Sequence, residues 1–191
     1  NIKMFEDAGI PLPSDNPEDA WTWDEVLDAA RKLNDPDNNV YGWNPTPWGF
    51  EAHEGTPFAQ QTFLWQAGAE ILSPDLSTAD GYLNSAEAKK ALQFFQDLYN
   101  KEGVSPKELP EDAFANGNVA IHADGPWSLS YLEENYPDFK VGEDFGVAPL
   151  WKGDQQVTPN GSWNLSISSQ SDSPNEVWLF LKWVTGVEGS K

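Results

Sequence analysis

The sequence contains no cysteine, and its basic residues are scarce. The absence of cysteine excludes disulfides, cysteine nucleophiles and thiolate metal sites. Only 11 of the 191 residues are lysine or arginine, against 31 aspartates and glutamates, which gives a formal net charge of −20. A surface of this charge repels phosphate backbones and anionic lipids, so we expect no nucleic-acid partner.

Long apolar runs are also missing. No stretch approaches the roughly 20 apolar residues that a membrane-spanning helix needs. The chain starts with Asn-Ile-Lys-Met and shows no signal peptide, so we expect it to be cut from a longer precursor. With 39% hydrophobic and 22% charged residues, its composition is that of a globular protein that can bury a sizeable core.

The usual signatures of catalysis are absent. The two histidines, His53 and His122, do not occur in an H-E-x-x-H pattern, and there is no G-x-S-x-G, P-loop or G-x-G-x-x-G motif. His122, in a predicted strand, is more typical of a structural or site-lining side chain than of a general base. Asp35 and Asp37 could begin a calcium loop, but Thr46 stands where an EF-hand requires a glutamate. We therefore expect no metal, no cofactor and no enzymatic activity, although the many carboxylates leave a glycosidase-like acid and base pair open.

Apolar spacing and helix caps predict alternating helices and short strands. Thr22 and Glu25 form a capping box that starts a helix with apolar positions up to Leu33, and Ser85 caps a second helix that ends at Gly103. Further helices are predicted over residues 2–8, 57–67, 111–116 and from Ser173 to Gly186. The expected strands cover residues 40–43, 69–72, 119–121, 145–150 and 163–167.

The segment 114–127 is the most informative one. It reads as a helix end at Gly117, a buried strand over 119–121, and a tight Gly125-Pro126 turn that starts a new helix. Trp127 then lies in the first turn, where free backbone N–H groups can hold ligand hydroxyls or anions beside an indole face. The alternative interpretation is that Trp127 only packs in the core.

Aromatic residues are abundant, at 13% of the chain with ten tryptophans among them. Flat rings contact the apolar C–H face of a sugar, while carboxylates, amides and backbone groups bond its polar rim. This combination suits a neutral carbohydrate. Five tryptophans lie in predicted loops or at element ends: Trp43, Trp48, Trp127, Trp151 and Trp163. Trp23, Trp178 and Trp183 lie on predicted helices and are assigned to the core.

Five stretches, in a fixed order, resemble family 1 extracellular solute-binding proteins, the sugar-capturing subunits of bacterial ABC importers. They are residues 5–10 (FEDAGI), 22–30 (TWDEVLDAA), 64–70 (LWQAGAE), 114–121 with 124–127 (FANGNVAI and DGPW), and 161–183, which contains GSWNLSI and SDSPNEVWLFLKW. Each stretch is weak alone, but their joint order is specific and spans nearly the whole chain.

The resemblance implies an α/β fold of the periplasmic-binding-protein type (class II), whose two lobes close over a ligand at a hinge. Residues 1–168 would form the carboxy-terminal-type lobe, a short mixed sheet flanked by helices. Residues 169–191 would begin the segment that crosses back to the other lobe. Half of the cleft would then lie outside this chain, and the last helix would expose Val177, Phe180, Leu181 and Val184 unless something covers them.

The resemblance also implies a set of ligand-binding residues. Trp127 of the Gly-Pro-Trp motif matches the position that stacks on a sugar ring, and Asp124 stands just before that motif. Phe58 matches an aromatic residue that lines the same cleft, and Trp163 matches, more loosely, a position on the hinge-side strand. The loop facing this region supplies Trp43, Trp48, Glu51 and His53.

We therefore predict a protein that binds a carbohydrate, a di- or oligosaccharide, and delivers it to the permease subunits of an ABC importer without chemistry. The resemblance implies an extracytoplasmic location, in the periplasm or on the outer face of the bacterial cell membrane. Contact with the membrane would be only through a lipid anchor in the missing amino-terminal part. The alternative hypotheses are a secreted carbohydrate-active hydrolase domain and a receptor of the same fold for a non-sugar solute.

Overall fold

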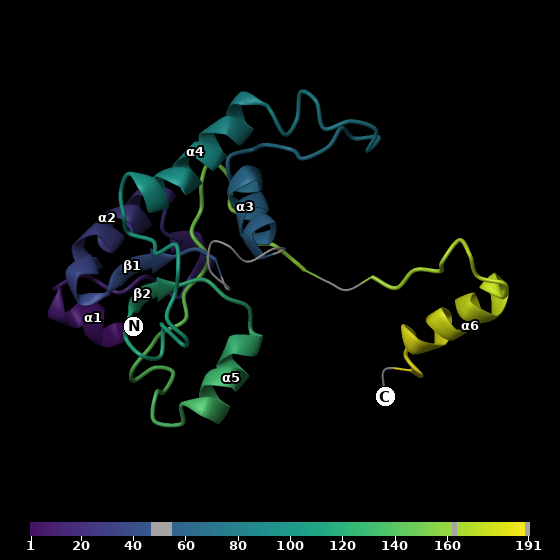
Figure 1. Cartoon of the computed structure of the whole chain (residues 1–191). Coiled ribbons are helices and arrows are strands. Elements are labelled where there is room, and N and C mark those ends of the chain that lie inside the picture. Colours follow the sequence, from purple (N-terminus) through teal and green to yellow (C-terminus); the bar gives the residue numbers. More distant parts are fainter. Residues whose placement is uncertain (47–54, 162–163, 190–191) are drawn as a thin grey trace. The chain divides into compact units, whose positions relative to one another are not determined.

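The computed structural model describes residues 1–46, 55–161 and 164–189, and the chain divides into two compact units, residues 1–159 and 160–191 (Figure 1). The helices of the first unit are α1 (Ile2–Asp7), α2 (Trp23–Leu33), α3 (Gly55–Gln66), α4 (Ala86–Asn100) and α5 (Trp127–Asn135), with 3-10 turns at Pro17–Asp19 and Pro36–Asn38. Its strands are β1 (Tyr41–Asn44) and β2 (Val119–His122). The second unit contains α6 (Pro174–Val184).

α2 begins with the predicted capping box, which is confirmed. The Thr22 hydroxyl accepts the Glu25 backbone N–H at 3.3 Å, and the Glu25 carboxylate accepts the Thr22 backbone N–H at 2.7 Å. The apolar residues behind the cap are all buried: Trp23, Val26, Leu27, Ala30 and Leu33. This face packs on β1, where a Cβ on Gly42 would lie 2.6 Å from Ala30 Cα. Glycine at this position therefore allows the helix to sit directly on the strand.

β1 and β2 pair in parallel, with Trp43 opposite Ile121 and Asn44 opposite His122. Both strands were predicted, each displaced by no more than one residue at either end. Because the strands are parallel, their carboxyl ends lie at the same edge of the sheet. That edge ends in two polar side chains, Asn44 and His122, and the chain leaves β2 there toward α5 (Figure 1).

An aromatic cluster forms the core of the first unit. Trp23 stacks on Phe94 with ring centroids 4.8 Å apart, and Trp43 meets Trp151 edge-on at 4.6 Å. Gln66 is fully buried among these rings, where its amide accepts from Trp23 Nε1 at 2.7 Å and donates to the Trp151 carbonyl at 2.6 Å. Each fully buried large apolar side chain contributes about 1.5–3 kcal/mol, so this cluster holds α2, α3, α4 and β1 together.

Some predicted elements are wrong. Residues 69–72 and 164–167 contain no strand, and 145–150 contains only an isolated bridge at Phe145. Phe145 is nevertheless buried, as the apolar run predicted. A short apolar run indicates burial, but it does not by itself distinguish a strand from an extended segment. The predicted helix over 111–116 is a series of turns, since Asp112 adopts a left-handed φ of 51° that a right-handed helix does not contain.

α6 exposes its apolar side chains in the second unit. None of its eleven residues is buried, and Trp178, Leu179, Phe180 and Trp183 are each between 55% and 64% exposed. The assignment of Trp178 and Trp183 to the core is therefore wrong, because nothing in the described part of this unit packs over them. Ser173 stands at the predicted cap position, but its side chain makes no capping hydrogen bond. None of the helices in the described part of the chain has the length and apolar character needed to span a bilayer.

Candidate functional site

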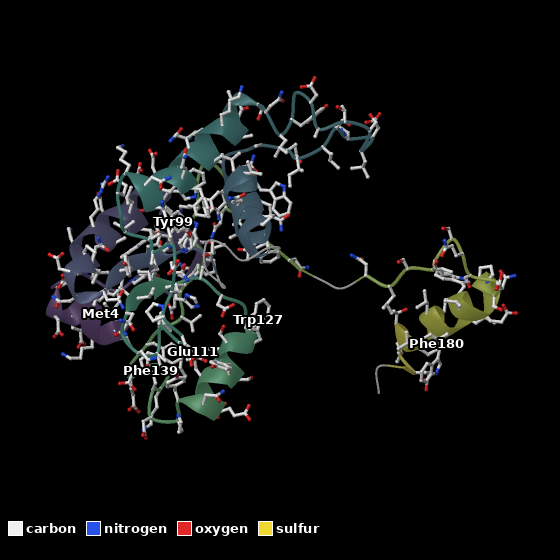
Figure 2. The ribbon with its side chains drawn as sticks, viewed as in Figure 1. Met4, Tyr99, Glu111, Trp127, Phe139 and Phe180 are labelled. Atoms are coloured by element: carbon white, nitrogen blue, oxygen red, sulfur yellow. The ribbon has the colours of Figure 1, made fainter. Side chains whose placement is uncertain are left out.

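The candidate site lies at the carboxyl edge of β1 and β2. In open α/β folds, ligands bind outside the carboxyl ends of parallel strands, where loops and helix N-termini converge. Here β2 ends at His122, the chain turns through residues 123–126, and α5 starts at Trp127. Trp127 projects from the first turn of α5 (Figure 2) and is 53% exposed.

Asp124 organises the turn that carries Trp127. Its carboxylate accepts the Gly125 backbone N–H at 2.8 Å and the Ser128 hydroxyl, so that it spans the start of α5. Pro126, at the N-cap, offers no side-chain cap, and the Asp124 carboxylate connects the turn to the first turn of α5 through the Ser128 side chain. The Trp127 ring lies so close over Gly125 that a Cβ there would overlap its six-membered ring. The turn therefore fixes both where α5 begins and the position of the Trp127 indole.

His122 connects this turn to β1. Its Nδ1 lies 3.1 Å from Asn44 Nδ2, and its Nε2 lies 3.7 Å from Asp124 Oδ2. The Phe114 ring stacks on the imidazole with centroids 5.6 Å apart. Burial would raise the pKa of Asp124, but the bonds from His122, Ser128 and the Gly125 N–H together hold that pKa below its usual value. The carboxylate is thus ionised at neutral pH, beside the indole.

A cavity of about 280 Å³ opens beside this turn. Its polar lining comes from Asp112, His122, Asp124, Ser128 and Tyr131, and its apolar lining from Leu109, Pro110, Ala113, Phe114, Ala115 and Leu132. No lysine or arginine is among these described lining residues. The cavity therefore offers carboxylates and hydroxyls to a ligand without offering it a fixed positive side chain.

Asp112 ties the far wall of the cavity to α5. Its carboxylate accepts the Tyr131 hydroxyl at 2.8 Å and also the Tyr136 hydroxyl. The hydrogen bond to Asp112 raises the pKa of Tyr136 to about 12 and raises the pKa of Tyr131, so both phenols stay protonated as donors. The backbone of Asp112 is left-handed, and its carboxylate accepts from one tyrosine within α5 and one at the end of that helix.

The structure brings together some of the residues that the sequence predicted. Trp127 and Asp124 lie in one turn, and Phe58 is half-buried in the first turns of α3. Trp43 is 0% exposed and packs against Phe63 and Trp151, so its indole contributes to the core and not to an open surface. Its position on β1 explains this burial, because that face of the strand is covered by α3 and α4. Trp48, Glu51, His53 and Trp163 lie outside the described residues.

Sequence reasoning missed Asn44, Ser128, Asp112 and Tyr131. Ser128 has a local signal, since it stands four residues after Asp124 at a helix start. Asn44 has none, because its contact with His122 depends on the register of two strands that are far apart in the sequence. Among the described residues, no group of three or more His, Cys, Asp or Glu side chains could hold a metal ion.

The family model for bacterial extracellular solute-binding proteins matches residues 1–191. Among curated proteins, the chain is 26% identical over 177 residues to a maltotriose-binding protein of Pyrococcus abyssi, covering 86% of this chain and 34% of that protein. It is 27% identical over 198 residues to a mannitol-binding protein of Pseudomonas aeruginosa, covering 95% of this chain and 41% of that protein. The chain thus spans well under half the length of these relatives.

Two solved structures share the fold. A solute-binding protein of an ABC transporter from Thermotoga lettingae, bound with α-D-tagatose, is 34% identical with a TM-score of 0.73, covering 97% of this chain and 46% of that one. The cyclic α-maltosyl-1,6-maltose binding protein of Arthrobacter globiformis is 26% identical with a TM-score of 0.64, covering 96% of this chain and 44% of that one.

Proposed function

The chain belongs to the bacterial extracellular solute-binding protein family, and from this premise we propose that it forms part of a receptor that captures a neutral carbohydrate for an ABC importer. The observation that carries the proposal is the exposed Trp127 ring, held over Gly125 beside the ionised Asp124 at the carboxyl edge of the sheet. An indole face suits the C–H face of a sugar or polyol, and the carboxylate suits its hydroxyls.

The charge of the site favours a neutral ligand over an anionic one. The described cavity lining holds two carboxylates, Asp112 and Asp124, and no lysine or arginine. The sequence from 45 to 56 adds Glu51 and Glu54 and contains no lysine or arginine either. A sugar phosphate or uronic acid would meet repulsion from these carboxylates. The sugars and polyols named for the relatives, maltotriose, mannitol and tagatose, are all neutral.

The proposal extends to the parts of the receptor beyond this chain. Residues 1–168 would be the carboxy-terminal-type lobe, and 169–191 would begin the crossing to the other lobe. We place the intact receptor outside the cytoplasm, in the periplasm or on the outer face of the membrane, where it would bind without turnover and deliver its ligand to permease subunits. Phe58, Trp48, Glu51, His53 and Trp163 remain proposed ligand contacts. Both lobes together would support an affinity near the micromolar level, about −8 kcal/mol.

The test is a titration of the intact receptor, both lobes included, with maltotriose, mannitol, tagatose and related sugars by calorimetry. Saturable binding with the sugar recovered unchanged would support the proposal. Cleaved sugar would indicate a hydrolase, and binding of a non-sugar solute only would indicate a different ligand class.

Trp127→Ala then tests the site itself. Truncation of a stacking aromatic costs about 1–3 kcal/mol or more, so we expect binding to fall at least tenfold and to become undetectable for a weak ligand. Trp127→Phe should retain part of the affinity. The matched control is Leu76→Ala, which truncates an exposed apolar side chain in another loop and should leave binding unchanged. Parent-like affinity in Trp127→Ala would overturn the site assignment.

A further inference from the structure

A row of polar side chains runs from the core of the first unit to the turn that carries Trp127, hydrogen-bonded except for the 3.7 Å contact between His122 and Asp124. It starts at Thr46, passes through Asn44 at the end of β1 and His122 at the end of β2, and ends at Asp124 and Ser128. Asn44 and Thr46 are both 0% exposed, so these polar groups depend on each other for hydrogen bonds. Nothing in the sugar-stacking role of Trp127 requires such a row.

The contacts of Asn44 fix its amide in one orientation. Its Nδ2 donates to the Thr46 carbonyl at 2.6 Å, and its Oδ1 accepts from the Thr46 hydroxyl at 3.2 Å. Turning the amide over would place its oxygen against the Thr46 carbonyl and lose that bond, because a carbonyl can only accept. The second N–H of Nδ2 is then directed at His122 Nδ1, 3.1 Å away, and that nitrogen has to accept.

The orientation of Asn44 in turn selects the tautomer of His122. With Nδ1 as the acceptor, the neutral imidazole carries its proton on Nε2, which faces Asp124 Oδ2 at 3.7 Å. The Phe114 ring stacked on the imidazole keeps it in the plane that reaches both neighbours. Asp124 accepts the Gly125 N–H and the Ser128 hydroxyl. These two bonds hold the turn on which the Trp127 ring lies.

We propose that His122 is a positioning residue, whose neutral Nε2–H tautomer holds the Asp124 turn and Trp127 in the binding arrangement, and that protonation of His122 weakens ligand binding. The second half rests on the proposed function. Protonation would put a second N–H on Nδ1, facing the N–H of Asn44 at 3.1 Å. Asn44 cannot turn to accept it without losing its bond to the Thr46 carbonyl, so the imidazolium has to move, and the turn moves with it.

In the described part of the chain, three titratable groups besides His122 line the same cavity. Asp124 comes from the turn itself, Asp112 from the 109–115 segment across the cavity, and Tyr131 from α5. On the β1 side the row meets Tyr99 of α4, whose hydroxyl interacts with Thr46 and whose pKa burial raises to about 12. The two carboxylates attract an imidazolium toward the cavity, away from Asn44. The expected movement on protonation is therefore toward the α5 side.

The first experiment measures sugar affinity of the intact receptor between pH 5 and 8, in the parent and in His122→Gln. A glutamine amide can accept from Asn44 and donate to Asp124, and it does not titrate. We expect the parent to lose about tenfold in affinity toward pH 5, equal to about 1.4 kcal/mol, while His122→Gln binds well and nearly independently of pH. His122→Phe should bind weakly at every pH. If His122→Gln keeps the slope of the parent, the proposal is wrong.

A ligand-free readout separates this proposal from the proposed function. Nitrogen-15 NMR of His122 should show the Nε2–H tautomer, and fluorine NMR of 5-fluorotryptophan at position 127 should shift with the protonation of His122. A receptor that binds no sugar but shows both signals would overturn the proposed function only. Absence of both signals in a receptor that binds sugar would overturn the role of His122 only.

Discussion

α2 and α6 are both eleven residues long and rich in apolar side chains, yet they end in different environments. Six residues of α2 are buried, whereas none of α6 is. α2 is covered by β1 and the aromatic cluster, which come from distant parts of the chain. Within the described part of residues 160–189, nothing covers the apolar side chains of α6. Local sequence thus specifies both helices, but burial depends on what the rest of the protein supplies.

The two helices also differ at their N-termini. Thr22 and Glu25 satisfy orphan N–H groups of α2 reciprocally, while Ser173 makes no side-chain bond to α6. α5 has no side-chain cap either, since the Asp124 carboxylate accepts the Gly125 N–H before the helix and the Ser128 hydroxyl. Good caps and burial occur together in α2, and both are absent in α6. The comparison therefore predicts large effects of substitution in the first unit and small ones in α6.

The largest difference is expected for aromatic truncation. Phe63→Ala removes a ring that is 1% exposed and contacts Trp23, Phe95 and Trp151. We expect a loss of about 3–5 kcal/mol in the free energy of unfolding, measured by urea denaturation. Phe180→Ala on α6 should change that value by no more than about 0.5 kcal/mol. A comparable loss in Phe180→Ala would show that α6 is covered in the folded chain.

Packing of α2 on β1 gives the next effect. A Cβ on Gly42 would lie 2.6 Å from Ala30 Cα and would overlap the Ala30 carbonyl, so Gly42→Ala should cost about 1–3 kcal/mol by overpacking. Thermal denaturation measures it. Gly146→Ala is the control, since no atom lies within 4 Å of its added Cβ. Equal melting temperatures for the two variants would contradict the close approach of helix and strand.

Asp124→Asn tests the start of α5. Loss of the charge weakens the bonds from Ser128 and the Gly125 N–H. We expect the free energy of unfolding, measured by urea denaturation, to fall by about 1–2 kcal/mol at pH 7. Because the pKa of Asp124 is lower in the folded state, its contribution is full above the unfolded pKa of about 3.9 and is lost as pH falls through the folded value. The difference in the free energy of unfolding between parent and variant should therefore disappear as the pH falls below 4. A gap that does not change with pH would mean that the charge contributes nothing.

Sequence reasoning succeeded where the signal is local. The capping box of α2, the Ser85 cap of α4 and the Gly125-Pro126 turn were all predicted from a few neighbouring residues, and the helices begin there. The strands were found as short apolar runs bounded by turn residues. The fold class follows from this alternation together with the family resemblance.

Sequence reasoning failed where partners are distant. Trp43 lies next to an aromatic-rich loop in the sequence, which suggested a ligand surface, but Phe63 and Trp151 bury it from positions 20 and 108 residues away. The pairing of Asn44 with His122 depends on strand register, which no local pattern gives. Asp112 interrupts a helix-like sequence with a left-handed backbone. Its carboxylate binds the hydroxyls of two tyrosines, on α5 and directly after it, which lie 19 and 24 residues further along the chain.

The smallest expected effects compare the caps of α2 and α6 directly. Thr22→Ala removes a hydroxyl that accepts the Glu25 N–H, and we expect a cost of about 1 kcal/mol in the free energy of unfolding, measured by urea denaturation. Ser173→Ala should cost no more than a few tenths of a kcal/mol, because its hydroxyl makes no capping bond. Thr22→Ser is the matched control and should restore most of the loss, since serine accepts the same N–H. If Thr22→Ala and Ser173→Ala cost the same, the cap does not contribute to the difference between the helices, and burial alone accounts for it.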